Sequence, residues 1–273
     1  MPELPEVETV ARTLAKSITG DTIDHLWLGE KPEPLKSPAH EIAATVEGTK
    51  ITSVHRVGKQ IAIDLEKPGA EGERRQFIIH LGMSGRLLVT TRDAEVPKHT
   101  HAIATLRSGR ELRFTDPRRF GRLSVHRAPT PFTGPGAEPL TIPLDDFIRL
   151  FHTRKTPIKA ALLNQKLLHG IGNIYADESL FLAGIRPRKS ATKLTRAELS
   201  RLHASIKQVL REAIKLGGSS VSDYVDADGN KGFFQLRHNV YLRTAQPCNV
   251  CGTPIKRITL AGRGTHYCPK CQK

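Results

Sequence analysis

The 273 residues are enough for two domains with hydrophobic cores, and 38% hydrophobic with 25% charged residues is ordinary for a globular protein. The charge balance is unusual: 42 Lys and Arg against 27 Asp and Glu give +15, beyond the magnitude of about 2 to 8 that solubility needs. The sequence has no long apolar run or basic amphipathic helix, which disfavours a membrane protein and leaves a polyanion, most commonly nucleic acid, as the expected partner.

The first residues predict a packed helix. Pro5 suits a first helical turn, the acidic residues after it suit the positive end of the helix dipole, and Gly20 follows the expected end. The start has neither the basic nor the apolar region of a secretory signal, so we expect a cytoplasmic protein whose N-terminus is anchored. Apolar residues recur at helical spacing along one face, namely Val7, Val10, Leu14 and Ile18.

From about Asp21 to His126 the pattern changes to short β-type runs separated by Gly, Pro and polar turns, which favours a β-sandwich or barrel. The following stretch, 128–143, contains five prolines and predicts an interdomain linker, because such a segment sustains neither a helix nor a central strand. The expected strands are Thr22–Leu28, Ile51–Val54, Gln60–Leu65, Gln76–His80, Arg86–Thr90, Ala102–Leu106, Glu111–Phe114 and Arg122–Val125.

The second half of the chain has helical patterns. Thr195 and Glu198 fit a capping box before an amphipathic stretch that ends at two glycines. The polar segment Gly218–Asn230 after it predicts a mobile loop. The expected helices are Asp145–His152, Pro157–Gln165, Asn173–Leu182 and about Arg196–Leu216.

All four cysteines lie in the last 26 residues, in the pattern Cys-x2-Cys, sixteen residues, Cys-x2-Cys. Two tight turns each deliver a pair of thiolates, and zinc prefers four such ligands in a tetrahedron. A pair of disulfides is the alternative, which the cytoplasmic location disfavours. Four cysteine ligands leave no open coordination position, so we expect one structural Zn²⁺ per chain, bound by Cys248, Cys251, Cys268 and Cys271.

The segment that holds the cysteines is basic. Seven Lys or Arg and no acidic residue lie from Arg237 to Lys273. Arg263 stands between two glycines at the tip of an expected hairpin, where backbone and guanidinium could approach a phosphate closely. A solvated loop arginine explains this local pattern equally well.

Five segments resemble the formamidopyrimidine-DNA glycosylase family: MPELPEVETV at the start, HLGMSG at 80–85, FTDPRRFG at 114–121, GIGNIYADE at 170–178 and GRGTHYCPKC at 262–271. They occur in the family's order from the first residue almost to the last, which makes the resemblance specific. It implies an α+β multidomain fold. We expect an N-terminal catalytic β-sandwich with flanking helices over 1–130, a helix-two-turns-helix domain over 131–237 and a C-terminal zinc-finger β-hairpin over 238–273.

The resemblance gives the start of the chain a chemical role. Removal of Met1 would leave Pro2 as a free secondary amine, which is the family's nucleophile. An α-amine has a pKa of about 7.7–8.0, about 2.5 units below that of a lysine side chain, so its unprotonated form costs about 3.4 kcal/mol less. A secondary amine also forms an iminium with a permanent positive charge, which is an electron sink. Without the resemblance, Pro2 would be an ordinary start-of-helix proline.

Three further residues complete the catalytic set that the resemblance implies. Glu3 would protonate the sugar ring oxygen as the glycosidic bond breaks. Lys59 would contact the phosphate next to the lesion and assist elimination, and Arg263 belongs to the same set. Glu6 matches a family glutamate that orients the active-site groups. For both glutamates the alternative is a favourable position at a helix N-terminus, and for Lys59 it is a solvated surface side chain.

The resemblance also assigns DNA contacts. Met83 and Phe120 would fill the gap that a flipped base leaves in the stack, and Arg118 would bind the estranged partner base. Core packing is the alternative for both apolar residues. Asn173 would hold a phosphate, with a helix N-cap as its alternative. The other residues predicted to bind DNA are Glu6, His99 and Lys159.

The chain departs from the family pattern at three positions. Ser222 lies in a loop where relatives often carry Lys or Arg, Asn164 replaces an expected acid, and Leu242 replaces an expected Gly. None adjoins the nucleophile, so the departures bear on substrate preference and kinetics and leave the reaction type unchanged.

These features together predict a bifunctional glycosylase and lyase that removes 8-oxoguanine and formamidopyrimidines from duplex DNA. Strand cleavage would follow by β- and then δ-elimination through a Pro2 iminium. We expect a monomer that associates with the bacterial nucleoid through DNA. Two alternatives remain: a sister branch that acts on oxidised pyrimidines with the same fold and nucleophile, and a non-catalytic DNA-binding protein on the same scaffold.

Overall fold

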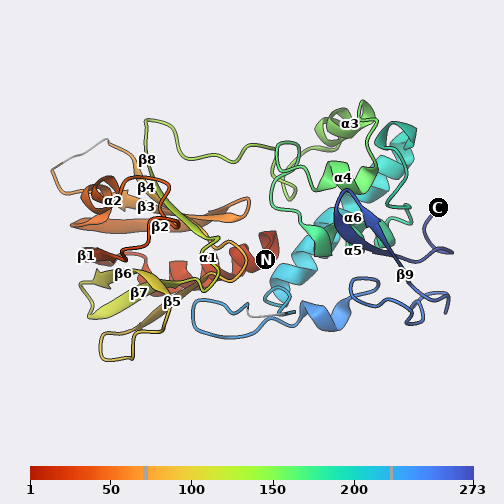
Figure 1. Ribbon diagram of the computed structural model, residues 1–273. Helices are drawn as coiled ribbons and strands as arrows, with labels where there is room; N and C mark the ends of the chain where they lie inside the picture. The colour runs from red at the N-terminus through yellow and green to blue at the C-terminus, as the bar shows by residue number, and fades with distance from the viewer. Residues whose placement is uncertain (70–72, 222–223) are drawn as a thin grey trace. The chain divides into compact units, whose positions relative to one another are not determined.

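The computed structural model describes residues 1–69, 73–221 and 224–273, and the chain divides into two compact units (Figure 1). Unit 1 comprises Met1–Thr133 and Gly217–Gly232, and unit 2 comprises Gly134–Leu216 and Phe233–Lys273. The chain leaves unit 1 within the proline-rich stretch that the sequence predicts to be a linker. The three domains expected over 1–130, 131–237 and 238–273 stay a prediction.

Unit 1 is built on an eight-stranded antiparallel sheet in the order β5-β7-β6-β1-β2-β3-β4-β8. The sheet is drawn as two layers in Figure 1, with β1 and β2 joined through the pairs Thr22–Lys50 and Ile23–Thr49. All eight strands expected from the sequence are confirmed, with ends that shift by up to three residues. Their bounds are β1 (Thr22–Leu28), β2 (Thr49–Val57), β3 (Gln60–Glu66), β4 (Arg75–His80), β5 (Arg86–Thr91), β6 (Thr100–Leu106), β7 (Arg110–Thr115) and β8 (Arg122–Arg127).

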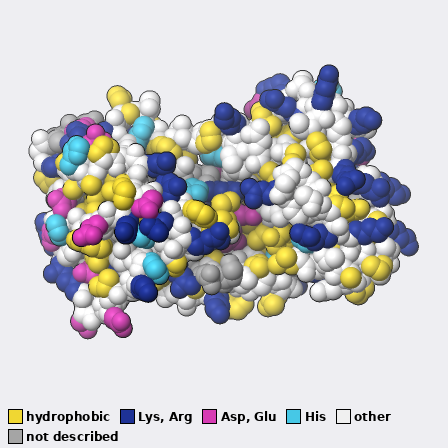
Figure 2. Space-filling view, viewed as in Figure 1, with side chains coloured by type: hydrophobic (Ala, Val, Ile, Leu, Met, Phe, Trp, Pro, Cys, Tyr) yellow, Lys and Arg dark blue, Asp and Glu magenta, His cyan; other side chains and the backbone are white. Residues whose placement is uncertain are grey.

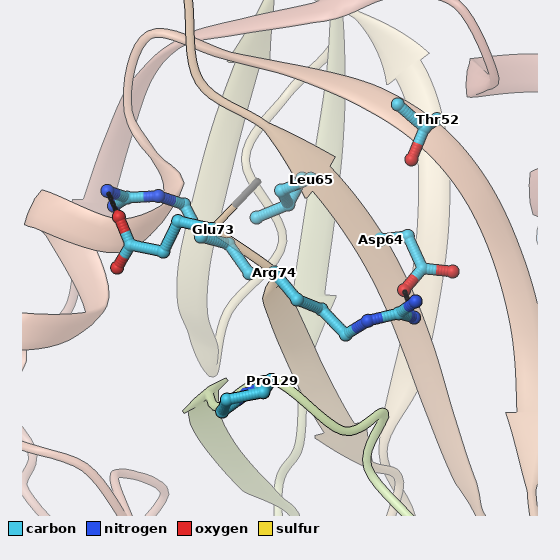
Figure 3. A pocket seen from close by; sticks show the side chains of 7 residues that line it. Thr52, Asp64, Leu65, Glu73, Arg74 and Pro129 are labelled. Atoms are coloured by element: carbon cyan, nitrogen blue, oxygen red, sulfur yellow. Dashed lines mark hydrogen bonds and ion pairs between the residues drawn. The ribbon is translucent and has the colours of Figure 1, made fainter. Parts of the chain in front are cut away.

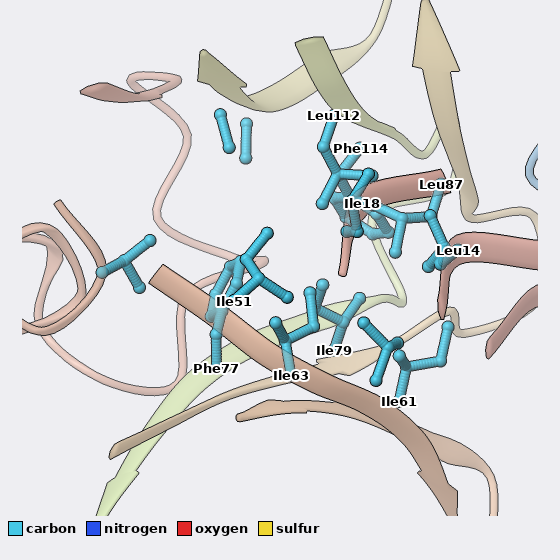
Figure 4. Packing of buried hydrophobic residues seen from close by; sticks show 14 of the residues in the cluster. Leu14, Ile18, Ile51, Ile61, Ile63, Phe77, Ile79, Leu87, Leu112 and Phe114 are labelled. Carbon is cyan, nitrogen blue, oxygen red and sulfur yellow. The ribbon is translucent and has the colours of Figure 1, made fainter. Parts of the chain in front are cut away.

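The core of unit 1 lies between the two layers and includes the first helix, α1 (Leu4–Ile18). Figure 4 shows side chains of both layers meeting those of α1. Burial of one such side chain stabilises the fold by about 1.5–3 kcal/mol, so α1 is firmly held and the start of the chain is anchored as expected. The labelled core residues are Leu14, Ile18, Ile51, Ile61, Ile63, Phe77, Ile79, Leu87, Leu112 and Phe114.

A second helix of unit 1, α2 (Ala39–Val46), is not among the expected elements. It is eight residues long, its N-cap is Pro38, and no side chain caps it, so the usual start signals are missing. Its stability comes from burial of Ile42, Thr45 and Val46 next to β1, β4 and β8. Tertiary packing therefore decides this helix, which local pattern cannot show.

Unit 2 contains the remaining helices and a two-stranded hairpin. The predicted capping box of Thr195 and Glu198 is present at the start of α6. The central helix α5 is buried on nearly all sides, from Ile174 to Phe181. Within the described ranges, no helix combines the length and apolarity needed to cross a bilayer. The elements are α3 (Leu144–His152), α4 (Ile158–Leu162), α5 (Asn173–Leu182), η1 (Ala191–Lys193), α6 (Arg196–Lys215), η2 (Phe234–Arg237), β9 (Lys256–Leu260) and β10 (Arg263–Tyr267).

Candidate functional site

The residues before α1 are held by a reciprocal capping box. Pro2 and Glu3 are buried, whereas the preceding Met1 is 49% exposed. The backbone N–H of Glu3 donates to Glu6 Oε2 at 2.8 Å, and the Glu3 carboxylate in turn caps the first turn. The structure thus brings the predicted nucleophile and both predicted glutamates together in one ordered turn.

The Glu6 carboxylate also binds the distant segment 217–232. Its second oxygen, Oε1, accepts the backbone N–H of Ser219 at 2.7 Å, and the Tyr224 hydroxyl donates to the Glu6 carbonyl at 3.2 Å. Gly218 has φ +82°, and a Cβ there would lie 2.9 Å from Glu6 Oε1, so a larger residue would disturb this contact. Burial and the Glu6 carboxylate raise the pKa of Tyr224, which keeps the hydroxyl a neutral donor.

Ser219 and Tyr224, which the sequence pattern did not single out, both contact Glu6. Their partner Glu6 lies more than 200 residues earlier in the chain, at sequence separations of 213 and 218. No local pattern carries a contact of that range. Ser222, one of the three family departures, lies outside the described residues.

Lys59 occupies the tight turn between β2 and β3. Val57 pairs with Gln60, so the turn has two residues, and Gly58 adopts φ +61° as such turns require. Burial, followed by the positive charge of Lys59, lowers the pKa of His80. The neutral His80 ring is therefore suited to accept the backbone N–H of Gly82 at its Nδ1, 3.1 Å away.

Met83, Arg118 and Phe120 lie on two neighbouring loops of unit 1. Met83 is 41% and Phe120 48% exposed, so neither is the core residue that the alternative interpretation would make it. The guanidinium carbon of Arg118 lies 4.9 Å from the centre of the Phe120 ring, a cation–π contact. Exposed apolar side chains beside a cation are suited to enter a base stack.

His99 lies in a strained backbone conformation, with φ +67°, beside a pocket of about 530 Å³. The pocket is lined in part by Trp27, His101 and Arg119. The His99 carbonyl accepts the backbone N–H of Asp116, which ties this residue to the loop of Arg118. The predicted DNA contacts His99 and Arg118 therefore share one region of unit 1.

In unit 2, Asn173 and Arg263 are linked through the hairpin of β9 and β10. Arg263 is exposed at the start of β10, beside the tight turn formed by Ala261 and Gly262, as the sequence predicts. The Asn173 side chain donates to the Gly264 carbonyl at 2.9 Å. The N-cap of α5 is Gly172, so the alternative role of Asn173 as that N-cap is wrong.

Lys159 is buried, with a side chain that is 1% exposed. Its ammonium lies 2.6 Å from Asp177 Oδ1 and donates to the Gly264 carbonyl at 3.0 Å and to Thr265 Oγ1 at 2.9 Å. The ammonium thus binds the inner side of the hairpin and is not accessible to solvent, so the predicted direct contact with DNA needs revision. Asp177, within the segment 170–178, also accepts the backbone N–H of His266 at 2.9 Å, and no local pattern marks it as a partner of Lys159.

The four cysteines are free thiols whose sulfur atoms all lie within 4.8 Å of one another. The Sγ atoms of Cys251 and Cys268 are 3.5 Å apart, and those of Cys248 and Cys271 are 3.9 Å apart. Tetrahedral Zn–S bonds of about 2.3 Å require sulfur separations of about 3.8 Å, so the residues fit zinc. The chain carries one structural zinc site, and the disulfide alternative is wrong.

The two other family departures have local explanations. Asn164 follows α4, and its Oδ1 accepts the backbone N–H of Lys166 at 3.0 Å, a turn contact that the expected acid could also make. Leu242 has φ +59° and is 55% exposed, so it occupies a left-handed position that favours glycine. The expectation of Gly at this position thus has a backbone cause.

Basic side chains are frequent on the face that Figure 2 shows, in keeping with the net charge of +15. A separate polar pocket of about 470 Å³ in unit 1, drawn in Figure 3, is lined by Thr52, Asp64, Leu65, Glu73, Arg74, Arg75 and Pro129. Burial raises the pKa of the Asp64 carboxyl there, but hydrogen bonds from His55, Ser53 and Gln76 outweigh burial and lower that pKa to about 2. None of the predicted site residues lines this pocket.

Three family sequence models match the chain. They are the formamidopyrimidine-DNA glycosylase N-terminal domain over residues 1–123, the formamidopyrimidine-DNA glycosylase H2TH domain over 134–225 and the zinc finger found in FPG and IleRS over 245–273. Curated relatives match the chain over its full length. The chain is 43% identical to the formamidopyrimidine-DNA glycosylase of Solibacter usitatus and 40% identical to that of Listeria monocytogenes, with 100% of each chain covered.

Solved structures give the same result for the fold. A complex between the Lactococcus lactis Fpg and DNA containing an abasic site matches with a TM-score of 0.89 and 34% identity, over 99% of both chains. The MutM (FPG) protein of Thermus thermophilus matches with a TM-score of 0.85 and 41% identity, over 99% of this chain and 98% of that one. The expected fold class is confirmed.

Proposed function

Because this chain belongs to the formamidopyrimidine-DNA glycosylase family, we propose that it excises oxidised purines from duplex DNA and then cleaves the strand. Its substrates would be 8-oxoguanine and formamidopyrimidines, and it would act as a monomer in the bacterial cytoplasm, where the chromosome lies. The observation that carries the proposal is the ordered turn of Pro2, Glu3 and Glu6 at the start of α1.

The chemistry begins at Pro2 once Met1 has been removed. The freed secondary amine attacks the anomeric carbon of the damaged nucleotide, the glycosidic bond breaks, and the sugar ring opens to an iminium. Glu3, adjacent in the chain, protonates the ring oxygen in this step. The iminium then draws electrons from the sugar and permits β- and δ-elimination of the two phosphates. Glu6 fixes the turn through its bonds to Glu3 and Ser219 and so orients the amine.

Cationic and polar groups would hold the DNA backbone. We assign phosphate contacts to Lys59, His99, Asn173 and Arg263, with Lys59 and Arg263 next to the reacting nucleotide and assisting elimination. Arg263 suits this role because it is exposed beside a hairpin turn whose backbone is fixed by internal bonds. For Lys159 we propose a positioning role: its buried ammonium holds the hairpin that presents Arg263.

Recognition of the lesion requires that its nucleotide leave the stack, at a cost of a few kcal/mol. Met83 and Phe120 would fill the vacated space, and Arg118 would donate to the orphaned partner base. The segment 217–232 would close over the flipped base, since its Ser219 and Tyr224 already contact the residue that orders the nucleophile.

Borohydride trapping tests the nucleophile. The protein is incubated with an 8-oxoguanine duplex and borohydride, and intact mass records whether Met1 is present. We expect a covalent adduct on chains that begin at Pro2, a reduced yield for Pro2→Gly, which keeps a primary amine, and none on chains that retain Met1. Pro5→Ala is the matched control at the same helix start and should trap normally. Equal trapping by chains that retain Met1 would disprove the role of Pro2.

A further inference from the structure

One buried carboxylate connects the two loops that carry Met83, Arg118 and Phe120. Asp116 is 0% exposed, and its Oδ1 accepts the Ser84 hydroxyl at 2.6 Å and the Arg118 N–H at 3.2 Å. Its Oδ2 accepts the Gly121 N–H at 2.7 Å. One donor therefore comes from the residue after Met83, and two come from the loop of Arg118 and Phe120.

The backbones of the same two loops are in close contact. Gly82 has φ +65°, and a Cβ there would meet the Gly121 nitrogen at 2.5 Å and the Phe120 carbonyl oxygen at 2.8 Å. Any side chain at this position would therefore separate the loops. The Ser84 hydroxyl also lies 3.3 Å from the Arg118 nitrogen, so Ser84, Asp116 and Arg118 form one hydrogen-bonded triangle.

The backbone of Asp116 is itself held by two hydrogen bonds, one to a residue of the neighbouring strand β6 and one to His99, which precedes that strand. Its N–H donates to the His99 carbonyl at 3.0 Å, and its carbonyl lies 2.9 Å from His101 Nε2. The carboxylate is thus anchored on the sheet, while the side chains that it indirectly carries are exposed. Hydrogen bonds to a charged acceptor are about twice as strong as neutral ones, which suits a rigid support for exposed side chains.

We infer that Asp116 and Ser84 form a clasp that fixes the position of the Met83 loop relative to the Arg118 loop. Met83 and Phe120, which fill the gap in the DNA stack, and Arg118, which contacts the partner base, would then enter the DNA together. The clasp makes Asp116 and Ser84 positioning residues for opposite-base discrimination. This inference rests on the proposed reading role of Arg118. A guanidinium contact to a base edge depends on placement within about 0.5 Å, which an unsupported exposed loop does not provide.

The sharpest test removes one hydroxyl. Ser84→Ala deletes the link to the Met83 loop and keeps the contacts of Asp116 with Arg118 and Gly121, whereas Ser84→Thr keeps the hydroxyl and should rescue. Ser53→Ala is the matched control, because Ser53 also donates to a carboxylate of unit 1, that of Asp64. Single-turnover excision of 8-oxoguanine opposite cytosine and opposite adenine gives the ratio that measures discrimination.

We expect Ser84→Ala to lower the cytosine-to-adenine ratio about 2- to 10-fold, as loss of one hydrogen bond allows, while Ser84→Thr and Ser53→Ala keep it. Asp116→Asn should lower the ratio at least as far, because its side chain has a single acceptor oxygen and must lose the N–H of either Arg118 or Gly121. A general loss of stability would slow excision opposite both bases and leave the ratio unchanged. Unfolding of Asp116→Asn would leave the Ser84 series to decide.

Arg118→Ala separates failure of the clasp from failure of the reading role. It should reduce the ratio by about 5- to 150-fold, the range of a good bidentate base contact. A ratio that falls in Arg118→Ala but stays at the wild-type value in Ser84→Ala and Asp116→Asn would overturn the clasp alone. A ratio unchanged in Arg118→Ala would overturn the reading role and the clasp with it, while trapping through Pro2 would still stand.

Discussion

Replacement of Lys159 by Met puts an unbranched apolar side chain, one atom shorter, in place of the buried lysine and removes its charge. The ammonium is 1% exposed and lies 2.6 Å from the carboxylate of Asp177, which is 0% exposed. Without its partner, Asp177 would be a buried charge that keeps only its contacts with the backbone N–H and ring of His266 among the described residues. Loss of one member of a buried pair costs about 3–5 kcal/mol, and we expect Lys159→Met to lower the free energy of unfolding of unit 2 by that amount.

Urea unfolding followed by circular dichroism measures this loss, and the fluorescence of Trp27, the single tryptophan, reports unit 1 separately. Hydrogen exchange at His266 should accelerate, because its amide is bonded to Asp177. The control is Lys189→Met, whose partner Glu198 lies 2.7 Å away in a partly exposed pair, 29% and 16% exposed, and which should cost about 0–1 kcal/mol.

A double replacement, Lys159→Met with Asp177→Leu, removes both charges and should recover much of the stability. A loss in Lys159→Met no larger than in Lys189→Met would refute the buried-pair reasoning. DNA binding gives an independent check. A lysine that contacts phosphate contributes about 0.9 to the slope of log K against log salt, so an unchanged slope is expected for Lys159→Met, and a slope reduced by that amount would restore the direct contact.

Three further predictions concern unit 2. Cys268→Ser should release the zinc and weaken DNA binding while Trp27 fluorescence stays native, and active wild-type protein without zinc would contradict it. Burial lowers the pKa of His238 from 6.5 to about 4, so the unfolded chain takes up the proton first and stability falls as pH decreases from 6.5 to 4. With zinc at saturating concentration, His238→Phe should reduce the dependence of the thermal midpoint on pH over this range. A pH dependence equal to that of the wild type would argue against this role of His238. Leu242→Gly should raise the free energy of unfolding by about 0.5–1 kcal/mol, because the φ of Leu242 is +59°. Leu236→Gly, at an exposed site without positive φ, should lower it. Equal effects of the two variants in urea unfolding would rule out backbone strain at Leu242.

The strands and the long helix could be predicted because their signals are local. Alternation and turn residues mark β1 to β8, and the capping box of Thr195 and Glu198 marks the start of α6. The cysteine spacing likewise encodes the zinc site, since each Cys-x2-Cys turn brings two sulfur atoms together without help from the rest of the chain.

The supports of the site could not be predicted in this way. Asp116 is part of a quoted motif, yet its bond to Ser84 spans 32 residues, and nothing in either segment alone indicates which donors the carboxylate meets. The same holds for Lys159 and Thr265, 106 residues apart. A lone lysine in a basic protein suggests a partner in solution, and only the fold shows that this one is enclosed. Burial is a property of the whole chain, so the local sequence does not show which side chains are enclosed and support the others.

The two separate pieces of unit 1 have a consequence for synthesis of the protein. Met1–Thr133 can begin to fold early, but the segment Gly217–Gly232 that completes the unit is translated about a hundred residues later. At about 5–20 residues per second, a ribosome needs roughly 5–20 s to cover that interval. During this time the Glu6 carboxylate has no Ser219 amide to bind. The contact between Glu6 and Ser219, which we propose orders the nucleophile, therefore becomes available only after most of the chain has been translated.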